Sequence, residues 1–180
     1  AASDVYKRQV TTLSGSASDL NTAYSSLGIS GLGNEAVTIS DISIDASVLN
    51  TLDSNTTGVI DASTVTTLTG SASDLNTAYS SSGISGLGNE AILVDSGTSS
   101  VSLANYLSAA TSGIVSATLS DGDMATLANL NESDNAYTIT ISDTSVDASA
   151  LNTLDSKTTV TINAAAAVSY THLRAHETIA

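Results

Sequence analysis

The chain has 180 residues, and its 18 Asp and Glu outnumber 4 Lys and Arg, for a formal net charge of −14. So few cations exclude nucleic acid as a partner, because binding its backbone needs Lys and Arg to neutralise phosphates. The only aromatic residues are six Tyr, and Cys is absent; this composition suits thin layers better than an ordinary globular core and removes thiolate chemistry.

The two ends resemble translated sequencing adapters. Ala1–Gln9 (AASDVYKRQ) is similar to the transposase-type adapter of short-read libraries, and Val168–Thr178 (VSYTHLRAHET) to the opposite adapter. We therefore expect residues 1–9 and 168–180 to be artefacts, and residues 10–167 to be a fragment of a longer repeat array. Those central residues keep 16 carboxylates and one basic residue, Lys157.

An internal repeat dominates the centre of the chain. Val10–Ala36 returns as Val65–Ala91 with only two changes, and Asp45–Thr57 recurs as Asp147–Thr159. Self-similarity of this kind is typical of repeat arrays, in which each unit buries a small face against its neighbours. The partners expected first are therefore neighbouring repeats of the same chain.

Short runs rich in β-branched residues alternate with segments that carry Leu at helical spacing. The β-branched runs predict strands at Val37–Ser40, Val59–Ala62, Ala91–Val94, Ile114–Thr118, Ala136–Ser142 and Val160–Asn163. The Leu-bearing segments predict helices at Ser16–Ser26, Asp45–Asn55, Ser71–Ser81, Ser100–Ala110, Asp121–Asn131 and Asp147–Ser156.

Capping residues support the helices at both ends. Ser16 with Asp19, and the same pair in the second copy, fit a capping box in which the carboxylate reaches back to the backbone. Asp45, Asp121 and Asp147 are expected N-caps. Left-handed C′ residues are predicted at Gly28, Gly58, Gly83 and Gly113.

The spacing of these elements predicts an α/β fold. Helix anchors recur from Leu20 to Leu151 at intervals that leave room for one strand and one helix in each repeat. We expect a repeat solenoid of short parallel strands and short helices joined by right-handed crossovers. An all-β solenoid is the alternative, because Ser, Thr and Gly dilute helical propensity.

The repeats resemble a known family. The stretch LNTLDSNTTGVIDASTVTTLTGSASDLNTAYSSSGISGLGNEA is similar to repeat regions of very large Thr/Ser/Asp-rich proteins of marine picocyanobacteria, some of them cell-surface proteins. The resemblance covers Val10 to about Ala91 and returns at Thr138–Thr159. It implies an extracellular or cell-surface repeat segment for attachment or spacing, with cell-surface glycans or other surface proteins as partners, and it supplies no catalytic residues.

Few residues are candidates for a ligand site. Asp121, Asp123, Glu132 and Asp134 are hard oxygen ligands that suit calcium. Their spacing fits neither an EF-hand loop nor the nonapeptide pattern of calcium β-rolls, and N-capping is the competing interpretation. The loop Gly28–Gly33 is glycine-rich but lacks the order of a dinucleotide fingerprint and follows a helix, so a turn is expected.

Catalysis is not expected. Residues 10–167 contain no His, so no Ser-His-Asp relay can be assembled. A Ser-Lys pair would need Lys157 to be buried beside a serine, and a solvated lysine at a predicted helix end is expected instead. No apolar run is long enough to insert in a membrane, and no cofactor is expected. The expected function is a structural spacer or adhesive stalk, and the alternatives are a calcium- or carbohydrate-binding adhesin module or a virion fibre segment.

Overall fold

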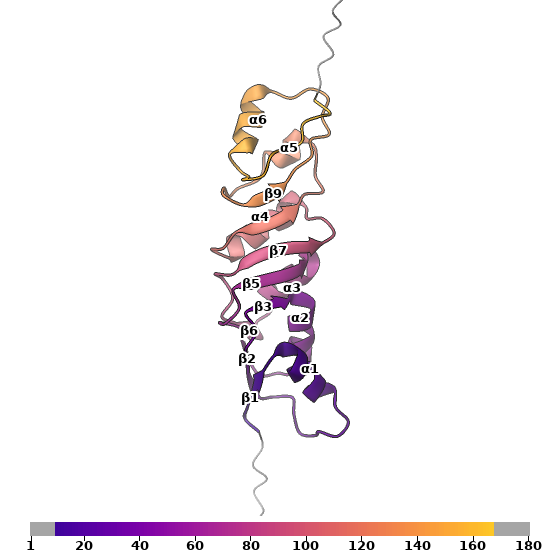
Figure 1. The fold of residues 1–180 in the computed structure, drawn as a ribbon, viewed down its shortest axis with the longest axis vertical. Coiled ribbons are helices and arrows are strands. Elements are labelled where there is room, and N and C mark those ends of the chain that lie inside the picture. Colours follow the sequence, from indigo (N-terminus) through magenta and orange to yellow (C-terminus); the bar gives the residue numbers. More distant parts are fainter. Residues whose placement is uncertain (1–9, 168–180) are drawn as a thin grey trace, which may run out of the picture.

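The computed structural model describes residues 10–167, and the two expected adapter segments lie outside the described residues. Six helices and nine strands form within residues 10–167, arranged as an elongated stack (Figure 1). The helices are α1 (Ala17–Ser25), α2 (Ala46–Asn55), α3 (Ala72–Ser80), α4 (Val101–Ala110), α5 (Met124–Leu127) and α6 (Ala148–Asp155). The strands are β1 (Thr12–Gly15), β2 (Ala36–Ile39), β3 (Ser43–Asp45), β4 (Ile60–Asp61), β5 (Thr67–Ser71), β6 (Ile84–Ser85), β7 (Ala91–Ser96), β8 (Val115–Thr118) and β9 (Ala136–Thr138).

The strands form two parallel sheets. One sheet has the order β1-β2-β4-β6 and the other the order β3-β5-β7-β8-β9. The first residue of β1, Thr12, pairs with Ala36, and in the second sheet Ser43 of β3 pairs with Thr67. Both steps cover the same length of chain, so each strand lies beside the strand one unit further along the chain.

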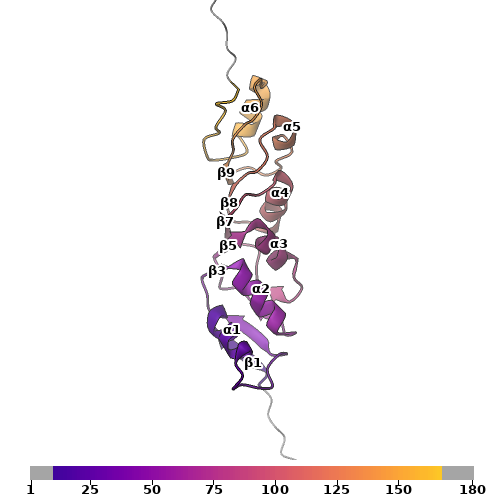
Figure 2. The ribbon, with the colours of Figure 1, turned by 90° about the vertical axis from the view of Figure 1, so that its right-hand side faces the viewer.

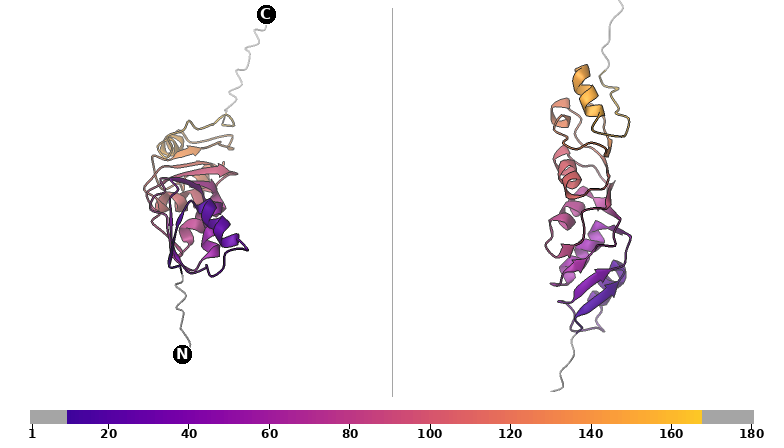
Figure 3. Two further views of the ribbon diagram at one scale, coloured as in Figure 1. Left: turned by 60° about the horizontal axis from the view of Figure 1, so that its bottom comes forward. Right: turned by 90° about the vertical axis from the view of Figure 1, so that its left-hand side faces the viewer.

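The helices fill the crossovers between parallel strands. Helices α1 to α4 contact one another in chain order, and Figures 2 and 3 show the helices following the length of the stack. Each helix begins after a residue whose side chain accepts a hydrogen bond from an early helical N–H. These N-caps are Ser16, Asp45, Ser71, Ser100, Asp123 and Asp147.

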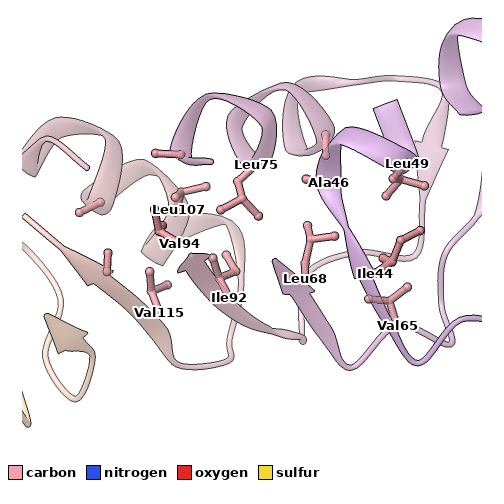
Figure 4. Packing of buried hydrophobic residues seen from close by; sticks show 14 of the residues in the cluster. Ile44, Ala46, Leu49, Val65, Leu68, Leu75, Ile92, Val94, Leu107 and Val115 are labelled. Atoms are coloured by element: carbon pink, nitrogen blue, oxygen red, sulfur yellow. The ribbon is translucent and has the colours of Figure 1, made fainter. Parts of the chain in front are cut away.

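The core is a thin layer between the helices and the sheets. Ile44, Leu68, Ile92 and Val115 stand in register on successive strands of the second sheet. Figure 4 shows them facing leucines from the helices above, and all are buried. The helix leucines in this view are Leu49, Leu75 and Leu107. Layers of Leu, Ile and Val thus take the place of the Phe and Trp that the chain lacks.

The predicted α/β class is confirmed, and the all-β alternative is wrong. All six predicted helices form, although the segment Asp121–Asn131 contains only the short α5, whose N-cap is Asp123. Four strands were not predicted, namely β1, β3, β5 and β6. Their Ser, Thr and Gly content hides the strand signal, and pairing with a neighbouring strand decides their conformation. Of the predicted strand Val160–Asn163, Asn163 forms an isolated bridge with Thr140.

The prediction of left-handed C′ glycines is wrong. The C-caps of α1 to α4, where these glycines were predicted, are extended residues such as Ser26 and Thr56, and the glycines with positive φ lie elsewhere, for example Gly31 and Gly33. Gly58 is needed for another reason. A Cβ there would stand 1.8 Å from the Glu35 carbonyl oxygen of the preceding unit. The capping box also differs, because the Ser16 hydroxyl donates to the Asp19 carboxylate at 2.8 Å.

Replacing Gly58 by Ala will destabilise the chain, because the new Cβ forces two units apart. We expect a loss of about 1–3 kcal/mol in the free energy of unfolding, measured by urea denaturation. Gly113→Ala should behave alike, since its Cβ would lie 2.3 Å from the Glu90 carbonyl oxygen. Gly28→Ala is the matched control, because its nearest neighbour would be Ser26 Oγ at 3.7 Å. Equal stability of all three variants would contradict this packing.

Candidate functional site

The four predicted calcium ligands do not converge on one site. Asp121 Oδ2 accepts a hydrogen bond from the Val101 N–H at 2.7 Å, and Asp123 Oδ1 accepts from the Thr126 N–H at 2.8 Å. Glu132 and Asp134 are exposed. Within residues 10–167 no group of three His, Cys, Asp or Glu side chains is placed to hold a metal ion. The structure therefore uses Asp121 and Asp123 at helix N-termini.

Asp121 belongs to a recurring contact between units. Asp41 Oδ2 accepts from the first N–H of α1, on Ala17, at 2.8 Å. Asp143 Oδ2 accepts from the first N–H of α5, on Met124, at 2.6 Å. Each carboxylate comes from the unit that follows the helix it caps. Negative charge at a helix N-terminus is favourable, so these aspartates bind one unit to the next.

A buried glutamate closes each glycine-rich loop, and neither glutamate was predicted from the sequence. Tyr24 Oη donates to Glu35 Oε2 at 3.0 Å. The N–H groups of Gly33 and Asn34 donate to the same oxygen at 2.8 and 3.2 Å. Glu35 is 0 % exposed. The loop amides that a phosphate would need are occupied by this carboxylate, which agrees with the turn expected here.

The second copy builds the same arrangement. Tyr79 Oη donates to Glu90 Oε1, and the N–H groups of Gly88 and Asn89 donate to Glu90 Oε2 at 2.8 and 3.0 Å. The next unit covers the glutamate, because Thr111 Oγ1 donates to its backbone oxygen at 2.6 Å. The signal for this pair in the sequence was a tyrosine at the same distance before a glutamate in both copies. A Glu in a polar Gly-Asn loop is, however, expected to be exposed.

The surroundings of Glu35 favour its ionised form. Burial opposes ionisation, but hydrogen bonds from Gly33, Tyr24 and Asn34 outweigh it and hold the pKa of Glu35 below its ordinary value. Burial and the neighbouring carboxylate raise the pKa of Tyr24. Burial and Glu90 likewise raise the pKa of Tyr79. Both pairs are thus a neutral phenol donating to a glutamate, an arrangement that shapes a loop.

A groove lies between α1 and α2. Its volume is about 500 Å³, and its lining carries hydroxyl and amide groups with one apolar side chain and no charge. Asn55 Nδ2 donates to Asn21 Oδ1 across the groove at 3.0 Å. The lining residues are Ser18, Asn21, Thr22, Ser25, Ser47, Val48, Thr51 and Asn55. A neutral polar ligand fits this chemistry better than an ion does.

Lys157 and Thr64 have structural partners. Lys157 Nζ donates to the Asn131 carbonyl at 2.8 Å, near the C-terminal end of α6. Thr64 Oγ1 donates to the carbonyls of Ile39 and Asp41, both at 3.0 Å. These side chains connect one unit to another.

Replacing Glu35 by Gln tests the loop and its charge. A folded-state pKa below the unfolded one means that the carboxylate stabilises the chain fully above pH 4.5, the ordinary value. This stabilisation is lost as the pH falls through the lower folded pKa. Glu35→Gln should therefore lower stability at pH 7 and flatten the loss of stability in acid, measured by urea denaturation from pH 3 to 7. Exposed Glu132→Gln is the control, and an unchanged acid slope in Glu35→Gln would contradict the assignment.

No family model, no curated protein and no solved structure matches the chain. In the part of the chain that the structure describes, no helix is both long enough and apolar enough to cross a membrane.

Proposed function

We propose that this chain is a segment of an acidic α/β solenoid that serves as a spacer or adhesive stalk in a secreted or cell-surface protein, without a catalytic role. The observation that carries the proposal is the register between units. Hydrogen bonds of one type join successive units along the stack, for example Val37 N–H to Val59 O at 2.9 Å and Ile92 N–H to Ile114 O at 2.9 Å.

Such an arrangement makes length a simple function of the number of units. Parallel strands lie about 4.8 Å apart in a sheet, so each unit extends the stack by that distance. Many contacts of a unit are made to the adjacent unit, as with Asp41 and the first turn of α1. A stack of this type lengthens by repetition without any change in its cross-section, which suits a spacer.

Composition supports a shaft whose copies resist lateral association. The net charge of −14 for the chain keeps copies apart laterally. The secreted or cell-surface location is proposed from the resemblance of the repeats to those of large Thr/Ser/Asp-rich surface proteins. A virion fibre would impose the same physical demands.

Carbohydrate binding is a second candidate, favoured by the uncharged groove between α1 and α2. Sugars are recognised by convergent hydroxyl and amide groups, which Asn21, Thr22 and Asn55 supply. Exposed Thr22→Arg would fill this groove without touching the core. Titration with neutral oligosaccharides should then show binding by the parent chain alone, whereas equal titrations would remove this candidate.

Inserting a further copy of residues 36–90 directly after Glu90 tests the spacer. The insertion adds two strand–helix units, so we expect the maximum dimension in small-angle X-ray scattering to grow by about 10 Å with an unchanged cross-section. The melting temperature should not fall, because every new unit has two neighbours. An insertion of the same length and composition in shuffled order is the control. A particle that grows equally in all directions would contradict the proposal.

Calcium separates the spacer from a calcium-binding module. We expect the melting temperature to be the same with and without millimolar calcium, because Asp121 and Asp123 are engaged at helix N-termini. Binding to the folded state would raise it, by more than about 5 °C for a site near saturation. Magnesium at equal ionic strength is the control, and a calcium-specific rise would favour the binding module.

A further inference from the structure

The two ends of the stack carry copies of segments that pack against each other in its middle. Residues 138–165 copy residues 36–63, and residues 10–36 copy residues 65–91. In the middle of the chain, residues 36–63 lie directly against residues 65–91, since β3 pairs with β5 and β4 with β6. The chain therefore contains both halves of this contact twice.

The contact in the middle includes specific hydrogen bonds. Backbone pairing joins Ile60 N–H to Gly83 O and Ala62 N–H to Ser85 O, both at 2.8 Å. Three side chains add further bonds from helix to helix, from loop to helix and from strand to strand. These are Asn50 Nδ2 to Asp74 O at 3.0 Å, Ser81 Oγ to Asp53 Oδ2 at 2.7 Å, and Ser85 Oγ to Ile60 O at 3.0 Å.

Both ends retain the residues that make these bonds. At the C-terminal end the counterparts of Asn50, Asp53 and Ile60 are Asn152, Asp155 and Ile162. In the middle, the partners in these bonds are Asp74, Gly83, Ser81 and Ser85. Their counterparts at the N-terminal end are Asp19, Gly28, Ser26 and Ser30. No donor or acceptor of the contact is lost, so the two ends are complementary.

The same residues are less buried at the ends than in the middle. Ile60 is 0 % exposed, whereas its counterpart Ile162 is only partly buried and lines a hollow at the end of the stack. Leu68 is 0 % exposed, and its counterpart Leu13 is partly buried. Ile29, the counterpart of β6 residue Ile84, is 50 % exposed. Apolar area remains at each end where the middle has a neighbouring unit.

The loop at the N-terminal end already has the conformation seen in the packed copy. Gly31 and Gly33 have φ of 87° and 136°, and Gly86 and Gly88 have 85° and 133°. The Tyr24–Glu35 bond holds this loop as Tyr79–Glu90 holds the other. Docking therefore requires little ordering of the loop, and the entropic cost of association is reduced.

We propose that a second copy of this chain docks head to tail. The N-terminal face, formed by β1, α1 and residues 26–33, packs on the C-terminal face, formed by residues 145–147, α6 and residues 162–164 of another copy. The joint repeats the contact between residues 36–63 and 65–91. Because the two faces differ, the contact is heterologous and propagates into a filament. Val10 and Ala167 both correspond to Val65. Within residues 10–167, they are therefore the only two residues that would occupy the same position in the joint.

Two single substitutions on opposite faces test the docking in the full chain. Ile29→Asp places a charge in the N-terminal face, and Asn152→Asp replaces the donor to the Asp19 carbonyl by an acceptor. Asn152 and Ile29 are exposed, so both variants should fold, as checked by circular dichroism. In sedimentation velocity we expect the parent chain to gain mass with concentration, and each variant to associate more than about tenfold less tightly.

Mixing the two variants is the decisive measurement, because each keeps the face that the other has lost. An equimolar mixture should form dimers and no larger assemblies. If the joint instead consisted of two identical faces, mixing the variants would not restore association. Leu27→Ser is the matched control. Within residues 10–167, Leu27 is the most exposed large apolar side chain, and its counterpart is Ser82, so this variant should associate like the parent.

Three results would overturn the docking: a parent chain that stays monomeric at all concentrations, association lost in Leu27→Ser, or no dimer in the mixture. The inference rests on the stacked units proposed above. A monomer that still lengthens when residues 36–90 are inserted would overturn the docking alone and leave the spacer intact.

Discussion

Backbone hydrogen bonding between parallel strands one unit apart is the constraint on which the rest of the structure depends. Parallel strands cannot be joined by a tight turn, so each step along a sheet needs a crossover. The register, with Thr12 opposite Ala36 and Ser43 opposite Thr67, leaves room for one short helix in that crossover. Helices of about three turns are unstable alone in water, and here each one is held by its cap, by the layer beneath it and by neighbouring units.

The sequence repeat and the structural register have different lengths, and this difference decides to which sheet a strand belongs. Two steps of the register lead from Leu13 to Val37 and then to Ile60, whereas the sequence repeat leads from Leu13 to Leu68. As a result β1 and β5, nearly identical in sequence, belong to different sheets. The sequence repeat is longer than two steps of the register. The middle units accommodate these additional residues by containing two strands each, as with β2 and β3 before α2. Caps and Tyr–Glu pairs are local, so they are the same in both copies, whereas sheet membership depends on the neighbours.

The acidic residues have structural roles that composition alone conceals. Asp45 and Asp147 cap their own helices, and Asp41 and Asp143 cap the helix of the preceding unit. Glu35 and its copy are buried in loops. A chain with few cations can hold these carboxylates because backbone N–H groups and hydroxyls, rather than Lys or Arg, donate hydrogen bonds to them, as to Oε2 of Glu35. A strongly negative charge is thus compatible with tight contacts between units.

Features that depend on neighbours along the chain could be predicted from the sequence. Alternating β-branched and Leu-bearing segments predicted the α/β class and the helices, and small polar residues before Leu predicted most of the caps. Contacts between units were decided only by the tertiary structure. The strands β1, β3, β5 and β6 form because a partner strand lies in the adjacent unit, Gly58 is required by the carbonyl of Glu35, and Asp121 serves the helix before it. In each case the deciding atom belongs to another unit of the chain, beyond the reach of local propensity.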